Sequence, residues 1–173
     1  MPSNVEIKAR VRDMEGLKKV AATLSGSDGE LLQQEDTFFY CRNGRLKLRV
    51  RKGFPSQLIS YDRPDETGPK VSEFYTTEIS DPDKLKFMLG RALGLQGTVK
   101  KDRWLYIVGQ TRVHVDQVHG LGDFMELEVM LKDGQTAKEG LLIAKDLMEK
   151  LGVQENDLLD CAYMDLILQQ DRK

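Results

Sequence analysis

The sequence predicts an α+β fold in which eight antiparallel strands close into a barrel and about four helices pack around its outside. Three observations support this prediction. The chain has 173 residues, a length that one domain with one core accommodates, so we expect a single domain over residues 1–173. Its strands follow one another through short turns, as antiparallel strands do. Several of these strands alternate between apolar and charged residues, and the predicted helices each carry an apolar face.

Alternation and turn residues define the strands. From Val5 to Val11, apolar and charged residues alternate with the period of two that a β-strand produces. The dipeptide Asn43-Gly44 favours a two-residue hairpin turn between the second and third strands. The predicted strands cover residues 5–11, 31–41, 45–52, 57–63, 71–79, 98–108, 112–118 and 124–131.

Capping residues and apolar spacing define the helices. Asp13 and Asp81 stand where N-caps are expected, and Pro follows Asp81 in the first turn. Thr136 and Glu139 form a capping-box pattern that opens a third helix. A fourth helix is predicted at about residues 157–168, where apolar residues recur at helical spacing.

Composition excludes several classes of protein. The chain has 26 Lys and Arg against 28 Asp and Glu, a net charge of −2, which is too low for binding nucleic acid through bulk charge. No run approaches the roughly 18 apolar residues of a membrane span. The charged N-terminal segment is unlike a signal peptide, and Cys41 and Cys161 lack metal-like spacing. We expect a cytoplasmic protein without a nucleic-acid or membrane partner.

The charged residues sort by sign from strand to strand. Lys47, Arg49 and Arg51 share one face of the third predicted strand, and Glu126 and Glu128 share one face of the eighth. Further stripes combine Glu6 with Lys8, Lys101 with Arg103, and Arg112 with His114 and Asp116.

These stripes face either water or the barrel lumen. In most half-exposed antiparallel sheets the charged face is solvated and the apolar face forms the core. The predicted helices, however, need an apolar surface to cover, and the apolar side of the sheet is the largest one available. With helices outside, the charged side chains point into the lumen.

A charged lumen limits what the barrel can contain. Dehydrated, unpaired charges cost several kcal/mol each, so the lumen must be wet or bind a group of complementary charge. Arg and Lys side chains suit phosphate oxygens. Clustered carboxylates suit hard divalent cations such as Mg²⁺ or Mn²⁺. The pattern therefore indicates a metal and polyphosphate site.

An ordered set of motifs resembles the CYTH family, also called triphosphate tunnel metalloenzymes. The family includes class IV adenylyl cyclases, thiamine triphosphatases and inorganic tripolyphosphatases. The matching motifs cover nearly the whole chain and lie at residues 4–8, 46–51, 61–64, 99–103 and 116–128. The resemblance implies an eight-stranded tunnel that binds a triphosphate through basic residues and one or two divalent ions through acidic ones.

The resemblance also implies residue roles. The phosphate ligands would be Lys8, Arg49, Arg51, Arg63, Lys101, Arg103 and Arg112. The ligands of Mg²⁺ or Mn²⁺, or the groups that hold the attacking water, would be Glu6, Asp116, Glu126 and Glu128. Of these residues, Glu6, Lys8, Glu126 and Glu128 would be catalytic. Further candidates are Lys47, Glu78, His114 and Asn4, which stands where the family signature has its first glutamate.

The expected activity is metal-dependent hydrolysis of tripolyphosphate or of an organic triphosphate such as thiamine triphosphate, by in-line attack of water. One alternative is cyclisation of ATP to cyclic AMP with release of pyrophosphate. Another is a non-catalytic polyphosphate-binding module, which the amide at Asn4 favours. In each case the partner is a small triphosphate, and the protein is expected to be a monomer or a homodimer.

Overall fold

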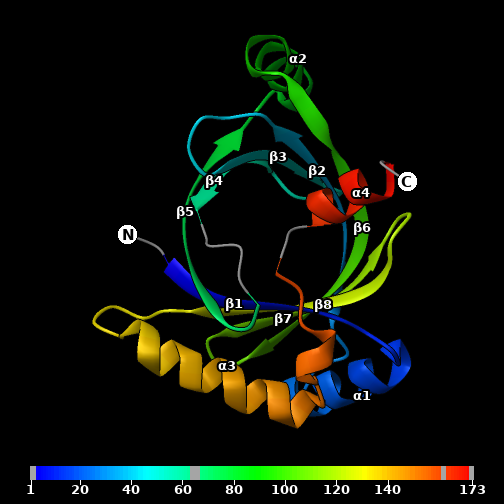
Figure 1. Ribbon diagram of the computed structural model, residues 1–173, viewed down its shortest axis with the longest axis vertical. Coiled ribbons are helices and arrows are strands. Elements are labelled where there is room, and N and C mark those ends of the chain that lie inside the picture. Colours follow the sequence, from blue (N-terminus) through cyan, green and yellow to red (C-terminus); the bar gives the residue numbers. More distant parts are fainter. Residues whose placement is uncertain (1–2, 63–66, 161–162, 172–173) are drawn as a thin grey trace.

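The computed structural model describes residues 3–62, 67–160 and 163–171, and these residues form a closed antiparallel barrel with four α-helices (Figure 1). The α+β prediction is confirmed. The strands are β1 (Ser3–Arg10), β2 (Glu30–Phe39), β3 (Arg45–Arg51), β4 (Ser56–Asp62), β5 (Lys70–Ile79), β6 (Leu95–Val108), β7 (Thr111–Val118) and β8 (Gly122–Met130). The helices are α1 (Met14–Ser25), α2 (Pro82–Leu93), α3 (Ala137–Leu151) and α4 (Tyr163–Asp171).

The strands close in the order β1-β5-β4-β3-β2-β6-β7-β8, with β8 pairing back to β1. Closure removes the sheet edges and gives every strand one inward and one outward face. In β1, for example, Val5 and Ile7 are buried on the outside, whereas Glu6 and Lys8 border the internal cavity. The charged residues of the alternating strands therefore face the lumen.

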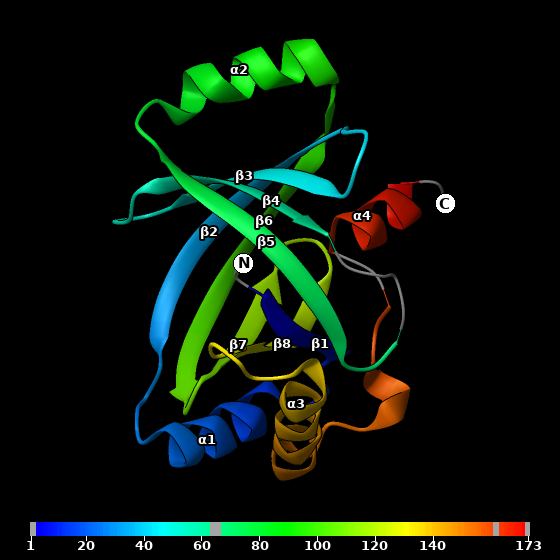
Figure 2. The same cartoon turned by 90° about the vertical axis from the view of Figure 1, so that its left-hand side faces the viewer.

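Helices cover the apolar outer face, which is why the charged face is left inside. α1 and α3 pack against β1, β6, β7 and β8 on one side of the barrel, and α2 lies on the opposite side near β2, β3 and β6 (Figure 2). Leu17 of α1 and Leu147 of α3 share a buried cluster with Ile7, Val113 and Leu127 of the barrel. Within the described residues, no helix is long and apolar enough to cross a membrane.

The last part of the chain differs from its prediction. The expected helix over 157–168 is replaced by a short 3₁₀ helix, Glu155–Asp157, and by α4, which begins at Tyr163. Between them the backbone is held against β1, because Leu158 pairs with Ala9 and the Leu159 N–H donates to the Lys8 carbonyl at 2.9 Å. These contacts keep the segment extended and bring α4 to one end of the barrel, away from the β3–β4 turn (Figure 2).

Candidate functional site

A cavity of about 240 Å³ lies inside the barrel. Its wall combines both signs of charge with amide and aromatic groups. The basic residues are Lys8, Lys47, Arg49, Lys101 and Arg112, and the acidic residues are Glu6, Asp36, Glu126 and Glu128. The wall also contains Asn4, Gln57, Phe38, Tyr61 and Tyr163. The cavity is therefore lined by side chains from strands all around the barrel and by one residue of α4.

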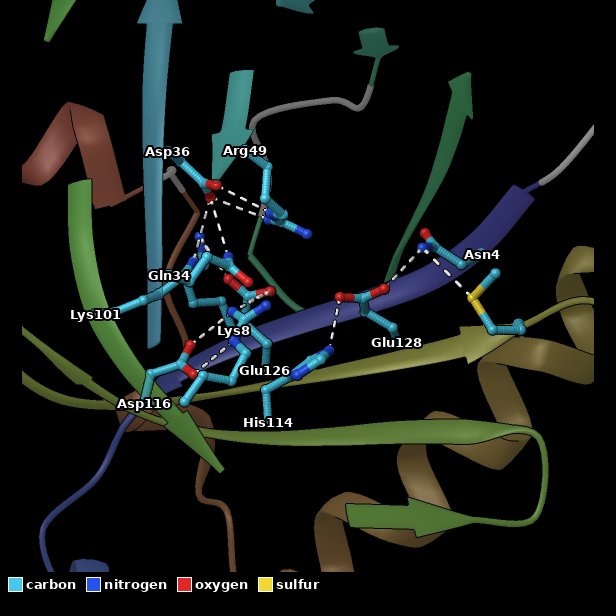
Figure 3. Close-up of polar contacts among 12 residues, drawn as sticks. Asn4, Lys8, Gln34, Asp36, Arg49, Lys101, His114, Asp116, Glu126 and Glu128 are labelled. Atoms are coloured by element: carbon cyan, nitrogen blue, oxygen red, sulfur yellow. Dashed lines mark hydrogen bonds and ion pairs between the residues drawn. The ribbon is translucent and has the colours of Figure 1, made fainter. Parts of the chain in front are cut away.

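Asp36 is the acidic centre of the basic half of the cavity (Figure 3). It lies on β2 opposite Arg49 of β3, which donates to it from Nε at 2.9 Å and from Nη2 at 3.0 Å. The ammonium groups of Lys47 and Lys101 lie 3.8 and 3.7 Å from the same carboxylate. Burial alone would raise the pKa of Asp36, but these three cations hold it far below its usual range.

The two lysines beside Asp36 are less basic than free lysine. Burial, together with the neighbouring charge of Arg49, lowers the pKa of Lys47 to about 7. Burial and the charge of Arg103 lower the pKa of Lys101 to about 8. Burial and the neighbouring guanidinium groups therefore disfavour the charged forms of both lysines, and an anion placed beside them would favour those forms.

Arg103 is held in place by a second buried carboxylate. It donates to Asp116 from Nε and from Nη2, both at 2.7 Å, and Asp116 is fully buried. Tyr163 of α4 donates its hydroxyl to the same carboxylate at 2.8 Å. Arg103 Nη2 also lies 3.5 Å from Glu126. The network fixes the guanidinium and links α4 to the charged wall.

The two glutamates of β8 have different partners. Glu126 forms an ion pair with Lys8 at 3.2 Å. Glu128 lies 2.9 Å from His114 Nε2 and 3.5 Å from the amide nitrogen of Asn4 (Figure 3). Burial would raise the pKa of Glu126, but the charges of Lys8 and Arg103 hold it well below its usual range. Burial and the charge of Arg103 lower the pKa of His114, which favours the neutral imidazole.

The donor chemistry of the acidic wall fits a divalent cation. The carboxylates of Glu6, Glu126 and Glu128 border one cavity, and Mg²⁺ and Mn²⁺ prefer such oxygen ligands. In the described part of the chain, no three acidic, His or Cys side chains are arranged as a ready metal site. The ion pair of Glu126 with Lys8 and the contact of Glu128 with His114 would have to open for both carboxylates to bind a metal.

Several residues predicted from the sequence lie away from the cavity wall. Arg51 is half-buried and directs Nη2 toward Gln57 at 3.4 Å. Glu78 is exposed and stands opposite Gln57 in the β4–β5 register. Arg63 lies outside the described residues. The assigned roles of all these residues, and of those on the wall, stay predictions.

Two residues of the site were missed by the sequence analysis. Asp36 lies in a strand with little regular alternation, where residues 33–36 are all polar. Tyr163 belongs to a helix whose packing against the barrel end is set by the preceding extended segment. The one sequence signal for Asp36 is that its strand precedes the basic strand in a predicted hairpin. That Asp36 stands opposite Arg49 follows only from the register of the two strands.

Comparison with known proteins agrees with this geometry. The CYTH domain matches residues 3–163 of the chain. The protein named adenylate cyclase CyaB from Aeromonas hydrophila is 29% identical over 170 residues, which cover 94% of this chain and 87% of that protein. The structure of the PH1012 protein from Pyrococcus horikoshii OT3 superimposes with a TM-score of 0.80 at 26% identity, covering 94% of this chain and 98% of that one. The fold is shared with HpAC1 from Hippeastrum, described as having a dominant triphosphatase activity, with a TM-score of 0.61, 16% identity, and 98% and 96% coverage.

Proposed function

The chain belongs to the CYTH family, and on that premise we propose that it is a divalent-metal-dependent hydrolase of tripolyphosphate or of an organic triphosphate such as thiamine triphosphate. The family binds triphosphates and typically uses divalent metals. The observation that carries the proposal is the group of five basic side chains around one internal cavity in a protein with a net charge of −2. Basic side chains that converge inside a cavity suit a compact polyanion rather than a long polymer, and the four acidic side chains of the same wall suit a divalent cation.

Catalysis would depend mainly on positioning and charge. Arg49, Lys47 and Lys101 would hold the phosphates along the barrel, because they already converge on the carboxylate of Asp36. Lys8, close to Glu126, would hold a further phosphate oxygen. A straightened triphosphate presents its terminal phosphorus for in-line attack by water, and the fixed cations stabilise the charge that develops on the leaving phosphate oxygens.

The acidic wall has a separate role. Glu6, Glu126 and Glu128 would hold Mg²⁺ or Mn²⁺, which when bound supplies charge neutralisation at the phosphates. Asn4 would leave this wall with one negative charge fewer than the family signature provides. His114 Nε2, 2.9 Å from Glu128, would orient this carboxylate.

A second activity has one specific observation in its favour. CyaB of Aeromonas hydrophila, which matches 94% of this chain, is named an adenylate cyclase. Cyclisation of ATP would use the same cations and would release pyrophosphate and cyclic AMP. We rank it second because the charged residues of the cavity account for binding of the phosphates and metal, whereas no group among the described residues is assigned to the adenine ring.

One assay separates these activities. Purified protein is incubated with Mg²⁺ or Mn²⁺ and, in turn, tripolyphosphate, thiamine triphosphate and ATP, and phosphate, pyrophosphate and cyclic AMP are quantified. The proposal expects phosphate without cyclic AMP. Cyclic AMP with pyrophosphate would select the cyclase, and binding without any product would select a binding module.

The role of the acidic wall is tested by changing both β8 glutamates. Glu126→Gln combined with Glu128→Gln should lower turnover by at least about 1,000-fold, because two of the three proposed metal ligands lose their charge. The measurement is steady-state phosphate release. The matched control is Glu35→Gln with Glu73→Gln, which removes two carboxylates from outward positions and should leave the rate within about twofold. Full activity of the β8 double variant would refute the assigned metal ligands.

A further inference from the structure

The ring of Tyr163 lies beside two of the basic side chains that border the cavity. Lys8 Nζ is 4.0 Å from the ring centroid, and Lys101 Nζ is 4.9 Å from it. These lysines belong to β1 and β6, which β7 and β8 separate in the barrel. One aromatic face supplied by α4 therefore bridges two strands that do not pair with each other.

Both contacts are shielded from water. Tyr163 is 3% exposed, Lys8 4% and Lys101 5%, and all three side chains border the cavity. An ammonium group within about 6 Å of an aromatic centroid is attracted by the negative face of the ring, and the attraction is stronger when the pair is desolvated. The ring therefore helps to stabilise two buried cations.

The ring differs in one respect from the carboxylates beside the same lysines. Glu126 lies 3.2 Å from Lys8, and Asp36 lies 3.7 Å from Lys101. Each carboxylate adds a negative charge that repels a phosphate placed near the lysine. The ring holds the ammonium groups without adding a net charge, so it favours the cations and does not oppose an anion.

The orientation of the ring is fixed from two sides. Its hydroxyl donates to Asp116 at 2.8 Å, and the same carboxylate accepts two hydrogen bonds from Arg103. Phe124 packs against the ring with centroids 5.1 Å apart and planes inclined at 55°. These contacts hold the aromatic face in one position, so the ammonium groups lie against a fixed surface.

We propose that Tyr163 is a positioning residue for triphosphate binding and that the face of its ring determines where the ammonium groups of Lys8 and Lys101 lie. The ring orders both cations before the anion arrives, so binding requires less ordering of side chains. Without the ring, each lysine follows its own carboxylate. This inference rests on the proposed function and adds to it an uncharged residue outside the strands.

The test separates the electronic effect of the ring from its packing. The variants are Tyr163→Phe, Tyr163→Leu, and proteins in which Tyr163 is replaced by phenylalanine carrying one, two or three ring fluorines. Each fluorine withdraws electron density from the ring face and weakens its attraction for a cation, whereas the shape of the ring changes little. Calorimetry with Mg²⁺ and bis-methylene triphosphate, which water does not cleave, gives the dissociation constant and the fraction of competent protein separately.

Affinity should follow the cation-binding strength of the ring. Tyr163→Phe keeps the aromatic face and should bind within about threefold of wild type, whereas Tyr163→Leu should bind about 10-fold or more weakly. The fluorinated rings should fall between these two in the order of their fluorine number. The matched control is Tyr40→Leu, because Tyr40 is 54% exposed and follows the last residue of β2. Its affinity should stay within about twofold of wild type.

Two results would overturn the inference. Equal affinities of the plain and the trifluorinated phenylalanine proteins would show that the ring acts only by packing. A loss in Tyr163→Leu that is confined to the competent fraction, with an unchanged dissociation constant, would show that the residue only stabilises α4. If wild type binds no triphosphate, the proposed function itself fails.

Discussion

Asp36 is the shared counter-ion of three basic groups of the cavity. Three basic groups lie within 3.8 Å of its carboxylate, and the side chain is 1% exposed. A bound polyphosphate would bring further negative charge to the same cations. Asp36 is therefore expected to stabilise the free protein more than it stabilises the complex.

Asp36→Asn tests this balance. The substitution leaves Arg49, Lys47 and Lys101 without their shared carboxylate, and an uncompensated buried charge should lower the free energy of unfolding by about 3 kcal/mol. Denaturant unfolding measures the loss. Tripolyphosphate should then raise the melting temperature of the variant more than that of wild type. The control is Glu73→Gln, which changes an exposed carboxylate on β5 and should alter the free energy of unfolding by no more than about 0.5 kcal/mol. If tripolyphosphate raises the melting temperature of Asp36→Asn less than that of wild type, the counter-ion role is contradicted.

The lysines predict proton uptake on binding. Lys47 and Lys101 have pKa values of about 7 and 8, so in the free protein both are partly deprotonated at pH 8. A bound polyanion favours their charged forms and raises both pKa values, so protons are taken up and affinity falls as the pH rises through about 7 and 8. The uptake should be on the order of one proton, read from calorimetry of ATP binding in buffers of different ionisation enthalpy.

Lys101→Met is the control for this linkage. Titration of the ligand is common to both proteins, so the difference in uptake at pH 8 isolates the lysine. The variant should take up fewer protons than wild type. The same uptake in both proteins, or net release in wild type, would show that Lys101 is not the responsible group.

Sequence reasoning identified the charged residues whose strand alternates clearly and missed the one whose strand does not. Arg49 and Glu126 each have apolar residues on both sides in the sequence. The alternation therefore predicted which charged residues lie on the same face of each strand. Asp36 is surrounded by polar neighbours, and its contact with Arg49 depends on the β2–β3 register. The ion pairs that hold Glu126 and Glu128 also join residues far apart in the chain, which pattern reasoning cannot pair.

At the scale of elements, local signals predicted three helices and their caps. Asp13 accepts a hydrogen bond from the Gly16 N–H, Asp81 accepts one from the Lys84 N–H, and the capping box of Thr136 is formed. The start of α4 was wrong because the segment before it is fixed by contacts with β1 instead of by its own periodicity. Tertiary contact overrode helical spacing at that point.

The position of α4 should depend on its ion pair with β3. Arg45 donates to Asp165 from two nitrogens, at 2.7 and 3.3 Å, and both side chains are largely buried. Arg45→Met should weaken the docking of α4 by about 1 kcal/mol, so that its amides exchange about fivefold faster while those of β7 and β8 are unchanged. Hydrogen exchange with mass spectrometry resolves the two regions.

The control for α4 removes an exposed ion pair. Lys150 lies 2.9 Å from Asp146 on α3, and both side chains are more than half exposed, so Lys150→Met should leave exchange in α3 almost unchanged. Uniformly faster exchange throughout Arg45→Met would mean that the ion pair stabilises the whole barrel and does not specifically hold α4.

At the scale of the whole molecule, closure of the barrel decides which way the charges face. The sequence left two orientations open, because an alternating strand is compatible with either. Pairing of β8 with β1 closes the sheet, and α1 and α3 bury the apolar outside against Ile7 and Leu127. The basic groups of the cavity are thereby withdrawn from the outer surface of a protein whose net charge is −2.

This arrangement predicts that nucleic acid does not bind, whereas the proposed triphosphate substrate does. A polymer gains affinity by neutralising many phosphates along a basic surface, and here the cations Lys8, Arg49 and Lys101 line a cavity that α4 covers at one end. A fluorescent 20-nucleotide DNA or RNA strand should show no change in anisotropy with about 10 µM protein at about 150 mM salt, a range in which nonspecific binders respond. If the strand binds and triphosphate displaces it, the polymer reaches the cavity. Enclosure of the basic groups inside the barrel would then not decide which anions the protein binds.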